Sequence, residues 1–296
     1  MCAEQSLAPY ETCCLAEIFL PNIKSKMELF DVAELLYRVN KHSLTLPSHH
    51  PETERIVHKN MRMGIGVTGY LQSSEEQKGW LSECYEYLRA FDEEYSDERG
   101  FSRSIKLTTV KPSGTLSLLP GVTPGAHPGY ARYMYRRVRI AAEHSLVETC
   151  RANGYPVEYQ RNFDGTEDYN TVVVTFPFSY PEGTVLAHHM TAIDQLKVIK
   201  ELQTNWSDNS VSCTIYYRKE EIPEIRKYLE ENYTTCHKSL SFLLHSEHGF
   251  QQAPYEEITE GKYNELVAKT TIIDSINGQL DLDTSSECAG GVCPIR

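Results

Sequence analysis

The sequence has little of what a membrane-bound, secreted or nucleic-acid-binding protein requires. No apolar run approaches the roughly 20 residues that cross a bilayer, and the first residues have neither the basic start nor the apolar stretch of a secretory signal. The 29 Lys and Arg residues are outnumbered by 41 Asp and Glu, which gives a formal net charge of -12. Nucleic acids and anionic membranes select basic surfaces, so we expect neither as a partner. These absences predict a cytoplasmic protein.

Paired-cysteine motifs are missing, although cysteine itself is not. None of the 9 cysteines forms a Cys-x-x-Cys pair, which disfavours a zinc ribbon or a thioredoxin-like motif, and we predict no metal site. An odd number of cysteines without a secretory signal favours free thiols over a disulfide framework. Cys84 and Cys150 fall in helical patterns and Cys213 in an alternating strand. We therefore expect these three thiols to pack as small hydrophobic side chains.

What is present is a regular alternation of helical and strand periodicity. Helices are predicted at residues 26–40, 80–91, 191–203 and 222–232, and strands at 105–110, 171–176, 211–217 and 239–244. Thr191 is the expected N-cap of the third helix. Strands separated by helices indicate an α/β fold with a largely parallel sheet or barrel. From about Asn277 the periodicity stops and Gly, Asp and Ser dominate, which predicts a flexible tail at 277–296.

Two cysteines in this tail, Cys288 and Cys293, flank Gly290-Gly291. Glycine gives the backbone the freedom that a small disulfide ring requires. A structural disulfide has little to hold together in a flexible tail. We therefore interpret the pair as a mobile dithiol that carries electrons by thiol–disulfide exchange.

The opposite end of the chain carries Cys2-Ala3-Glu4, followed by Cys13. On an extended loop, residues two apart point to one side, as a thiol and a general base would need. Taken alone, such a pair is more often a frayed terminus than a functional site.

Glycines at 64, 66 and 69 match the dinucleotide-binding pattern Gly-x-Gly-x-x-Gly. The preceding residues 56–62 are mixed and basic rather than a buried strand, and no acidic residue follows at about 20 positions to hold a ribose. We interpret the glycines as a strand or turn where backbones approach closely.

A loop rich in Gly, Ser and Thr at residues 111–117 follows the strand predicted at 105–110. Backbone N–H groups and hydroxyls in such a loop can converge on a phosphate. The loop lacks the Gly-Lys-Ser/Thr of a nucleotide-triphosphatase, and a simple turn remains an equal alternative.

Taken in order, these segments resemble the adenosylcobalamin-dependent (class II) ribonucleotide reductases, particularly the monomeric ribonucleoside-triphosphate reductases. The resemblance covers nearly the whole chain. It rests on Cys2-Ala3-Glu4, Cys13, residues 15–22, 62–69, 111–117, 125–130, 208–212 and 252–256, and the cysteines of the tail.

The resemblance implies the reduction of ribonucleotides, as triphosphates, to 2′-deoxyribonucleotides by thiyl-radical chemistry that adenosylcobalamin initiates. Cys2 matches the cysteine that becomes the thiyl radical and takes the ribose 3′ hydrogen. Glu4 matches the carboxylate that takes the 3′-hydroxyl proton, and Cys13 one of two reducing thiols. The substrate phosphates would be held by Ser113, Gly114, Thr115 and Ser117. The tail dithiol, Cys288 and Cys293, would re-reduce the active-site disulfide and exchange with thioredoxin.

The implied fold is the second half of a ten-stranded α/β barrel over residues 1–276, with an active-site finger loop at 1–22. Several features of the family would precede Met1. They are the asparagine of the active-site loop, the first half of the barrel, the second reducing thiol and the allosteric site. We therefore expect a C-terminal portion that needs a separate N-terminal chain for activity. Two alternatives remain. One is an iron-dependent (class I) reductase with Tyr216-Tyr217 in its radical relay, and the other is a non-catalytic remnant that binds nucleotide phosphates.

Overall fold

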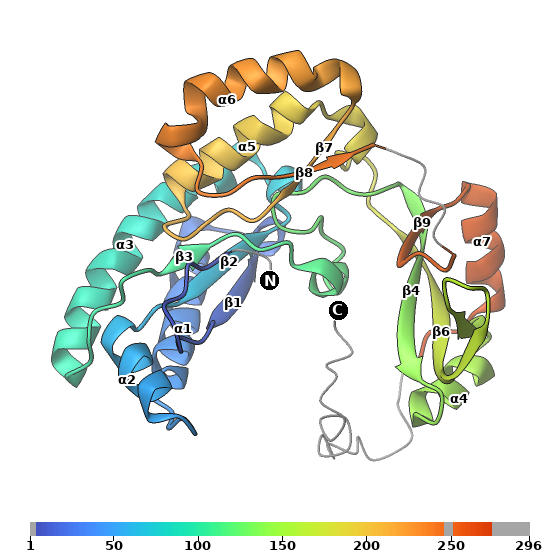
Figure 1. Ribbon diagram of the computed structural model, residues 1–296, viewed down its shortest axis with the longest axis horizontal. Coiled ribbons are helices and arrows are strands. Elements are labelled where there is room, and N and C mark those ends of the chain that lie inside the picture. Colours follow the sequence, from blue (N-terminus) through green and yellow to red (C-terminus); the bar gives the residue numbers. More distant parts are fainter. Residues whose placement is uncertain (1–3, 246–250, 274–296) are drawn as a thin grey trace. The chain divides into compact units, whose positions relative to one another are not determined.

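The computed structural model describes residues 4–245 and 251–273. The chain divides into two compact units (Figure 1). The first unit comprises residues 1–132 and 180–247, and the second comprises 133–179 and 248–296. Within the described ranges, no helix has the length and apolar character to cross a membrane.

The first unit is built on parallel strands. β1 (Leu15–Phe19), β2 (Gly64–Thr68) and β3 (Thr108–Thr109) form one sheet in this order, with β2 in the middle. Every residue of β2 is buried, as expected for a strand of a parallel sheet that is covered on both faces.

A second pair of parallel strands continues this arrangement. β7 (Thr214–Tyr217) pairs with β8 (Ser241–Leu244). A parallel bridge joins Val110, after β3, to Val211, in the segment that leads into β7. The strands of the first unit therefore follow one another in one direction, in the order β1, β2, β3, β7 and β8.

The glycines of β2 are explained by close packing. A Cβ atom at Gly66 would lie 2.6 Å from Oε2 of Glu17, and one at Gly64 would lie 2.7 Å from Cδ2 of Leu15. The residues before β2 form a helix rather than a strand. The interpretation of the glycine pattern as a strand is therefore confirmed, and the close neighbours of Gly64 and Gly66 are side chains of β1.

Five helices in the described part of the first unit lie between these strands along the chain (Figure 1). They are α1 (Lys26–Ser43), α2 (Pro51–Asn60), α3 (Glu75–Arg99), α5 (Ala192–Asn205) and α6 (Ile222–Cys236). Short 3-10 turns lie at Leu20–Asn22 (η1), Tyr70–Gln72 (η2), Gly114–Leu118 (η3), Ala187–His189 (η4) and Lys219–Glu221 (η5).

A buried ion pair joins α1 to α3. Lys41 Nζ lies 2.9 Å from Asp92 Oδ1, and both side chains are fully buried. Tyr37 also donates to Asp92, and the Lys41 ammonium donates to Ser104. Because both charges are desolvated, removing one partner would leave the other uncompensated, which typically costs about 3–5 kcal/mol.

The second unit contains an antiparallel sheet with the order β5-β6-β4-β9. Its strands are β4 (Tyr133–Ala141), β5 (Val157–Arg161), β6 (Glu167–Ser179) and β9 (Tyr255–Glu257), and its helices are α4 (Ser145–Ala152) and α7 (Glu260–Lys269). Val147 and Cys150 of α4 pack against Val172 and Val174 of β6 to form its core.

The α/β class is confirmed, and so is the helical nature of all four predicted helices, with Thr191 capping α5. The expectation of a largely parallel sheet is correct only for the first unit. The strand predicted at 171–176 is the middle of β6, which is antiparallel to both of its neighbours. The predicted strand at 105–110 is reduced to the two residues of β3. Cys84, Cys150 and Cys213 are buried as predicted.

Candidate active site

The predicted phosphate loop forms a tight turn directly after β3. Ser113 has φ 45° and Gly114 has φ 46°, both in the left-handed region, and the 3-10 turn η3 follows. Ser117 is buried and its hydroxyl donates to the carbonyl of Gly114 at 2.7 Å. The predicted residues Ser113, Gly114, Thr115 and Ser117 thus lie in one compact turn.

Thr68, the last residue of β2, holds this turn through a hydrogen bond to Ser113. Its Oγ1 lies 2.5 Å from Oγ of Ser113 and accepts a hydrogen bond from the backbone N–H of Gly125, also at 2.5 Å. Gly125 has φ 56°, and a Cβ atom there would collide with the carbonyl oxygen of Lys111. The start of the loop, at Lys111 and Ser113, is therefore held by contacts that tolerate little change.

Lys111, the first residue of the loop, is directed toward the sheet. Its Nζ lies 3.1 Å from Oε2 of Glu17 in β1, whose side chain is only 3% exposed. No other described residue hydrogen-bonds to the Glu17 carboxyl group. Burial raises the pKa of Glu17 to about 7, against the lowering effect of Lys111, and the charge of Glu4 raises it further.

Glu4 lies close enough to Glu17 for their charges to interact. Its backbone carbonyl accepts from the N–H of Ser210 at 2.9 Å, and the next side chain, Gln5, donates to the carbonyl of Cys14 at 3.3 Å. The segment at Glu4 is thus held between β1 and the residues before β7. The structure brings Glu4 and the phosphate loop to one place through Glu17 and Lys111.

Cys13 lies two residues before β1. It is exposed and lines a pocket of about 340 Å³ with Leu44, Pro47 and His49 among others. The neighbouring thiol of Cys14 has its pKa raised to about 11, first by burial and then by Cys13, so Cys14 stays protonated at neutral pH. Cys2, Cys288 and Cys293 lie outside the described residues.

Sequence reasoning missed Glu17 as a site residue. A signal for it exists in the pattern Leu15-Ala16-Glu17-Ile18-Phe19, where a carboxylate interrupts an apolar strand. The space for that carboxylate comes from Gly66 on the adjacent strand, and only strand pairing reveals this relation.

The part of the chain that the structure describes contains no cluster of metal-ligating side chains. No group of three or more His, Cys, Asp or Glu side chains within residues 4–245 and 251–273 could hold a metal ion. The pockets described there have volumes of about 340 to 680 Å³, which suits molecules of drug or nucleotide size.

Comparison with known proteins gives a consistent result. No family model matches the chain. A protein of Dictyostelium discoideum named "Probable adenosylcobalamin-dependent ribonucleoside-triphosphate reductase" is 33% identical over 307 residues, which covers 99% of this chain and 40% of that protein. The adenosylcobalamin-dependent ribonucleoside-triphosphate reductase of Euglena gracilis is 35% identical over 281 residues, 90% of this chain and 37% of its own length.

Solved structures agree. A B12-dependent (class II) ribonucleotide reductase superimposes with a TM-score of 0.76 at 27% identity, covering 99% of this chain and 44% of that one. The class Id ribonucleotide reductase alpha subunit of Actinobacillus ureae, at 14% identity and a TM-score of 0.54, shares the fold. The chain spans about two fifths of the length of the curated relatives described. The chain is thus a homologue, along nearly its whole length, of part of the adenosylcobalamin-dependent (class II) ribonucleoside-triphosphate reductases.

Proposed function

We propose that this chain supplies the substrate-phosphate loop and part of the reacting groups of an adenosylcobalamin-dependent ribonucleoside-triphosphate reductase. The reaction would convert ribonucleoside triphosphates to 2′-deoxyribonucleotides. The names of the relatives support this proposal. The structural observation that carries it is the anchoring of the loop at residues 111–117 to Glu17, next to Glu4.

In this proposal the loop binds the triphosphate. Ser113, Gly114, Thr115 and Ser117 surround a turn in which Gly114 adds no side chain, so an anion can approach the backbone closely. The Lys111 ammonium is paired with Glu17, and its contribution is to hold the loop in place.

The reacting groups in this proposal are those that the family resemblance implies. Glu4 would accept the proton of the ribose 3′-hydroxyl, which requires a carboxylate within hydrogen-bond reach of that oxygen. Cys2 would carry the thiyl radical, and Cys13 would be one of the two thiols that reduce the 2′ position. Bound adenosylcobalamin would supply the initial radical.

The five parallel strands of the first unit support a further part of the proposal. We infer that they form half of a ten-stranded barrel, which a separate N-terminal portion of the enzyme completes. That portion would also provide the second reducing thiol. An iron-dependent enzyme is less well supported, since Tyr217 packs against the hydrophobic core and the named relatives depend on adenosylcobalamin.

The experiment that tests this function is complementation. The 296-residue chain alone is expected to show no reduction of ribonucleoside triphosphates. Addition of the N-terminal portion of a relative, with adenosylcobalamin and a dithiol reductant, should restore it and produce cob(II)alamin absorbance. Cys2→Ser should remove the absorbance change again. Robust reduction by the chain alone would refute the need for the N-terminal portion. No reduction in the complemented protein would refute the reductase function.

The dithiol Cys288 and Cys293 would regenerate the enzyme, with thioredoxin as its electron donor. Cys288→Ser and Cys293→Ser in the complemented protein should each abolish thioredoxin-driven turnover while a single turnover is retained. Dithiothreitol should partly rescue turnover, because it can reach the active-site disulfide directly. Cys236→Ser is the matched control. Full thioredoxin-driven turnover in either tail variant would contradict the shuttle.

A further inference from the structure

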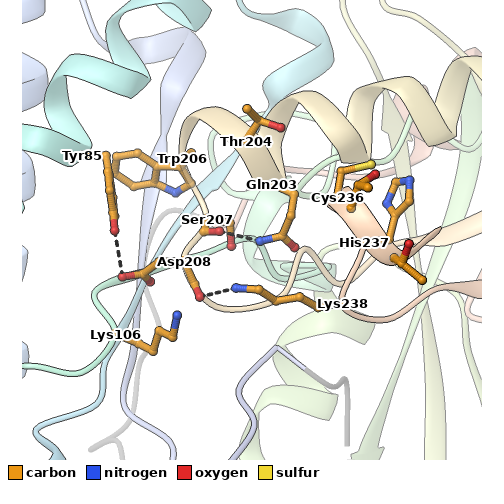
Figure 2. A pocket seen from close by; sticks show the side chains of 12 residues that line it. Tyr85, Lys106, Gln203, Thr204, Trp206, Ser207, Asp208, Cys236, His237 and Lys238 are labelled. Carbon is orange, nitrogen blue, oxygen red and sulfur yellow. Dashed lines mark hydrogen bonds between the residues drawn. The ribbon is translucent and has the colours of Figure 1, made fainter. Parts of the chain in front are cut away.

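A polar pocket lined by Lys106, Asp208, His237 and Lys238 lies in the first unit (Figure 2). Its volume is about 550 Å³. It is formed where α5 and α6 end and where the segments that lead into β3 and β8 begin. The phosphate loop instead follows the carboxyl end of β3. The two places therefore lie at opposite ends of the same parallel strands, within one unit.

Basic side chains outnumber acidic ones around this pocket. Lys106 and Lys238 line it, and Asp208 is the acidic lining residue. Arg89 adds a third positive charge, with Nη1 at 3.8 Å from Oδ2 of Asp208. The chain as a whole is acidic, with a net charge of -12. Its overall composition therefore does not account for a group of basic side chains at this pocket.

The carboxylate of Asp208 is already engaged by the backbone. It accepts from the N–H of Leu107 at 3.1 Å and of Thr108 at 3.0 Å, and from the hydroxyl of Tyr85 at 3.4 Å. Its acceptor positions are therefore largely used in joining the end of α5 to β3, which limits how far it compensates the lysines.

The two lysines differ in their partners. The Lys238 ammonium donates to the backbone carbonyl of Asp208 (Figure 2) and to that of Asn209, whereas the Lys106 ammonium makes no hydrogen bond or ion pair with the described residues. Burial lowers the pKa of Lys238, and the charge of Lys106 lowers it further, partly offset by Asp208. The lysines therefore repel each other across the pocket, and a bound anion would relieve this repulsion.

His237 provides a further polar group in the same wall. Its Nε2 lies 3.2 Å from the hydroxyl of Tyr228, while its Nδ1 is buried and has no hydrogen-bond partner among the described residues. A buried ring nitrogen without a partner is unfavourable unless a ligand satisfies it.

We propose that this pocket is a binding site for a phosphate group of a small anionic ligand, distinct from the loop at 111–117, with Lys106 and Lys238 as its cationic contacts and His237 as a neutral one. Lysine ammonium groups are compact charges that bind phosphate oxygens well. The volume exceeds that of a single phosphate, so the ligand carries further groups. The inference does not depend on the proposed reductase function.

The chain contains a site-specific reporter for the test. It has only 2 tryptophans: Trp206 lines the pocket, and Trp80 does not. In a titration of the full chain with inorganic phosphate, followed by 1H–15N NMR of the indole N–H groups, the Trp206 signal should shift and the Trp80 signal should not. Parallel titrations with ATP and with uncharged adenosine separate recognition of the phosphate from recognition of the nucleoside.

Lys106→Met is the decisive variant, because the Lys106 ammonium has no partner among the described residues, and the backbone carbonyl of Lys106 that accepts from the N–H of Met63 is kept. It should weaken phosphate binding by about tenfold or more, as expected for the loss of one charge-assisted contact. Lys59→Met, which removes an exposed lysine of α2, should leave the affinity unchanged, and Lys106→Arg should retain most of it. Gly114→Val should not alter the Trp206 response, which separates this site from the substrate loop.

Three outcomes would overturn the inference. They are a Trp206 signal that does not respond to phosphate or ATP, equal responses in wild type and Lys106→Met, and a response to adenosine alone.

Discussion

Glu17 is the residue whose surroundings most clearly determine its chemistry. It is buried on β1, faces the space left by Gly66, and is paired with the ammonium of Lys111. A carboxyl group in such a place holds its proton more tightly than in water, because burial penalises the charged form. The loop at residues 111–117 is therefore attached, through Lys111, to a carboxyl group whose pKa is raised by burial to about 7.

The first prediction concerns the pH dependence of stability. The pKa of Glu17 is raised from 4.5 to about 7, so between these values the folded state binds a proton that the unfolded state releases. Stability should therefore fall as pH rises through this window, by at most about 3 kcal/mol. Glu17→Gln mimics the protonated form and should remove this fall in urea unfolding curves.

Lys111→Met is the companion variant. Loss of the ammonium removes the interaction that lowers the pKa of Glu17, so the fall in stability should extend to higher pH. An unchanged pH profile in Glu17→Gln would show that Glu17 does not titrate in this window.

The second prediction concerns the loop backbone. Gly114 has φ 46° with open space around it, so valine there would strain the backbone and obstruct a phosphate. Gly114→Val should raise the Michaelis constant for nucleotide in the complemented protein. Ser113→Ala should do so by a smaller factor, since a hydroxyl contact contributes about 1–2 kcal/mol.

Gly165 offers a matched control for Gly114. It also has a positive φ, 84°, with open space around it, and it lies in the turn between β5 and β6. Gly165→Val should introduce comparable strain without changing the Michaelis constant. Equal effects of the two valines would indicate that the loop is only a turn.

At the scale of elements, the segment at 208–212 connects α5 to the strands. Asp208 accepts backbone N–H groups of β3 and the residue before it. Asn209 donates to the carbonyls of Met63 and Thr108, both at 2.8 Å. The motif that carried part of the family resemblance therefore has a structural role, which is to hold β2, β3 and the end of α5 in register.

The third prediction tests this connection. Asp208→Asn keeps the size of the side chain but removes the negative charge that strengthens its hydrogen bonds. It also replaces one carboxylate oxygen by an NH2 group, which cannot accept from the backbone N–H groups of Leu107 and Thr108. We expect a loss of about 1–3 kcal/mol in the free energy of unfolding, measured by urea denaturation. Asp164→Asn is the control, because Asp164 accepts similar bonds from Thr166 in an exposed turn and should change stability much less. A similar small loss at both positions would mean that Asp208 does not lock the strands.

At the scale of the whole molecule, the first unit leaves apolar surface uncovered. A pocket of about 680 Å³ is lined mainly by Tyr217, Ile222, Ile225, Leu229, Tyr233 and Phe242. In addition, β1 and β8 each pair with one strand only within the described part of the chain. Strand edges with unpaired backbone groups favour association with another chain.

The fourth prediction follows from these edges. The isolated chain should self-associate in analytical ultracentrifugation, and addition of the N-terminal portion of a relative should replace the self-association by a defined complex. Ile222→Lys should reduce the self-association, while Ile272→Lys, which also changes an exposed isoleucine, should not. A chain that remains monomeric at all concentrations would contradict the role of these edges.

The sequence by itself determined the α/β class, the helices with strong apolar periodicity and the burial of three cysteines, because these depend on local spacing of side chains. It also indicated the phosphate loop, since strand, glycine and hydroxyl residues are adjacent in the chain. Tertiary structure alone decided that β6 is antiparallel, because strand direction depends on which partner pairs with it. Likewise, only the pairing of β1 with β2 created the buried space for Glu17, and only the approach of Lys111 gave that carboxylate its partner. The contact between Glu17 and Lys111 joins residues nearly 100 positions apart. Such contacts leave no local pattern in the sequence, and they assemble the candidate site.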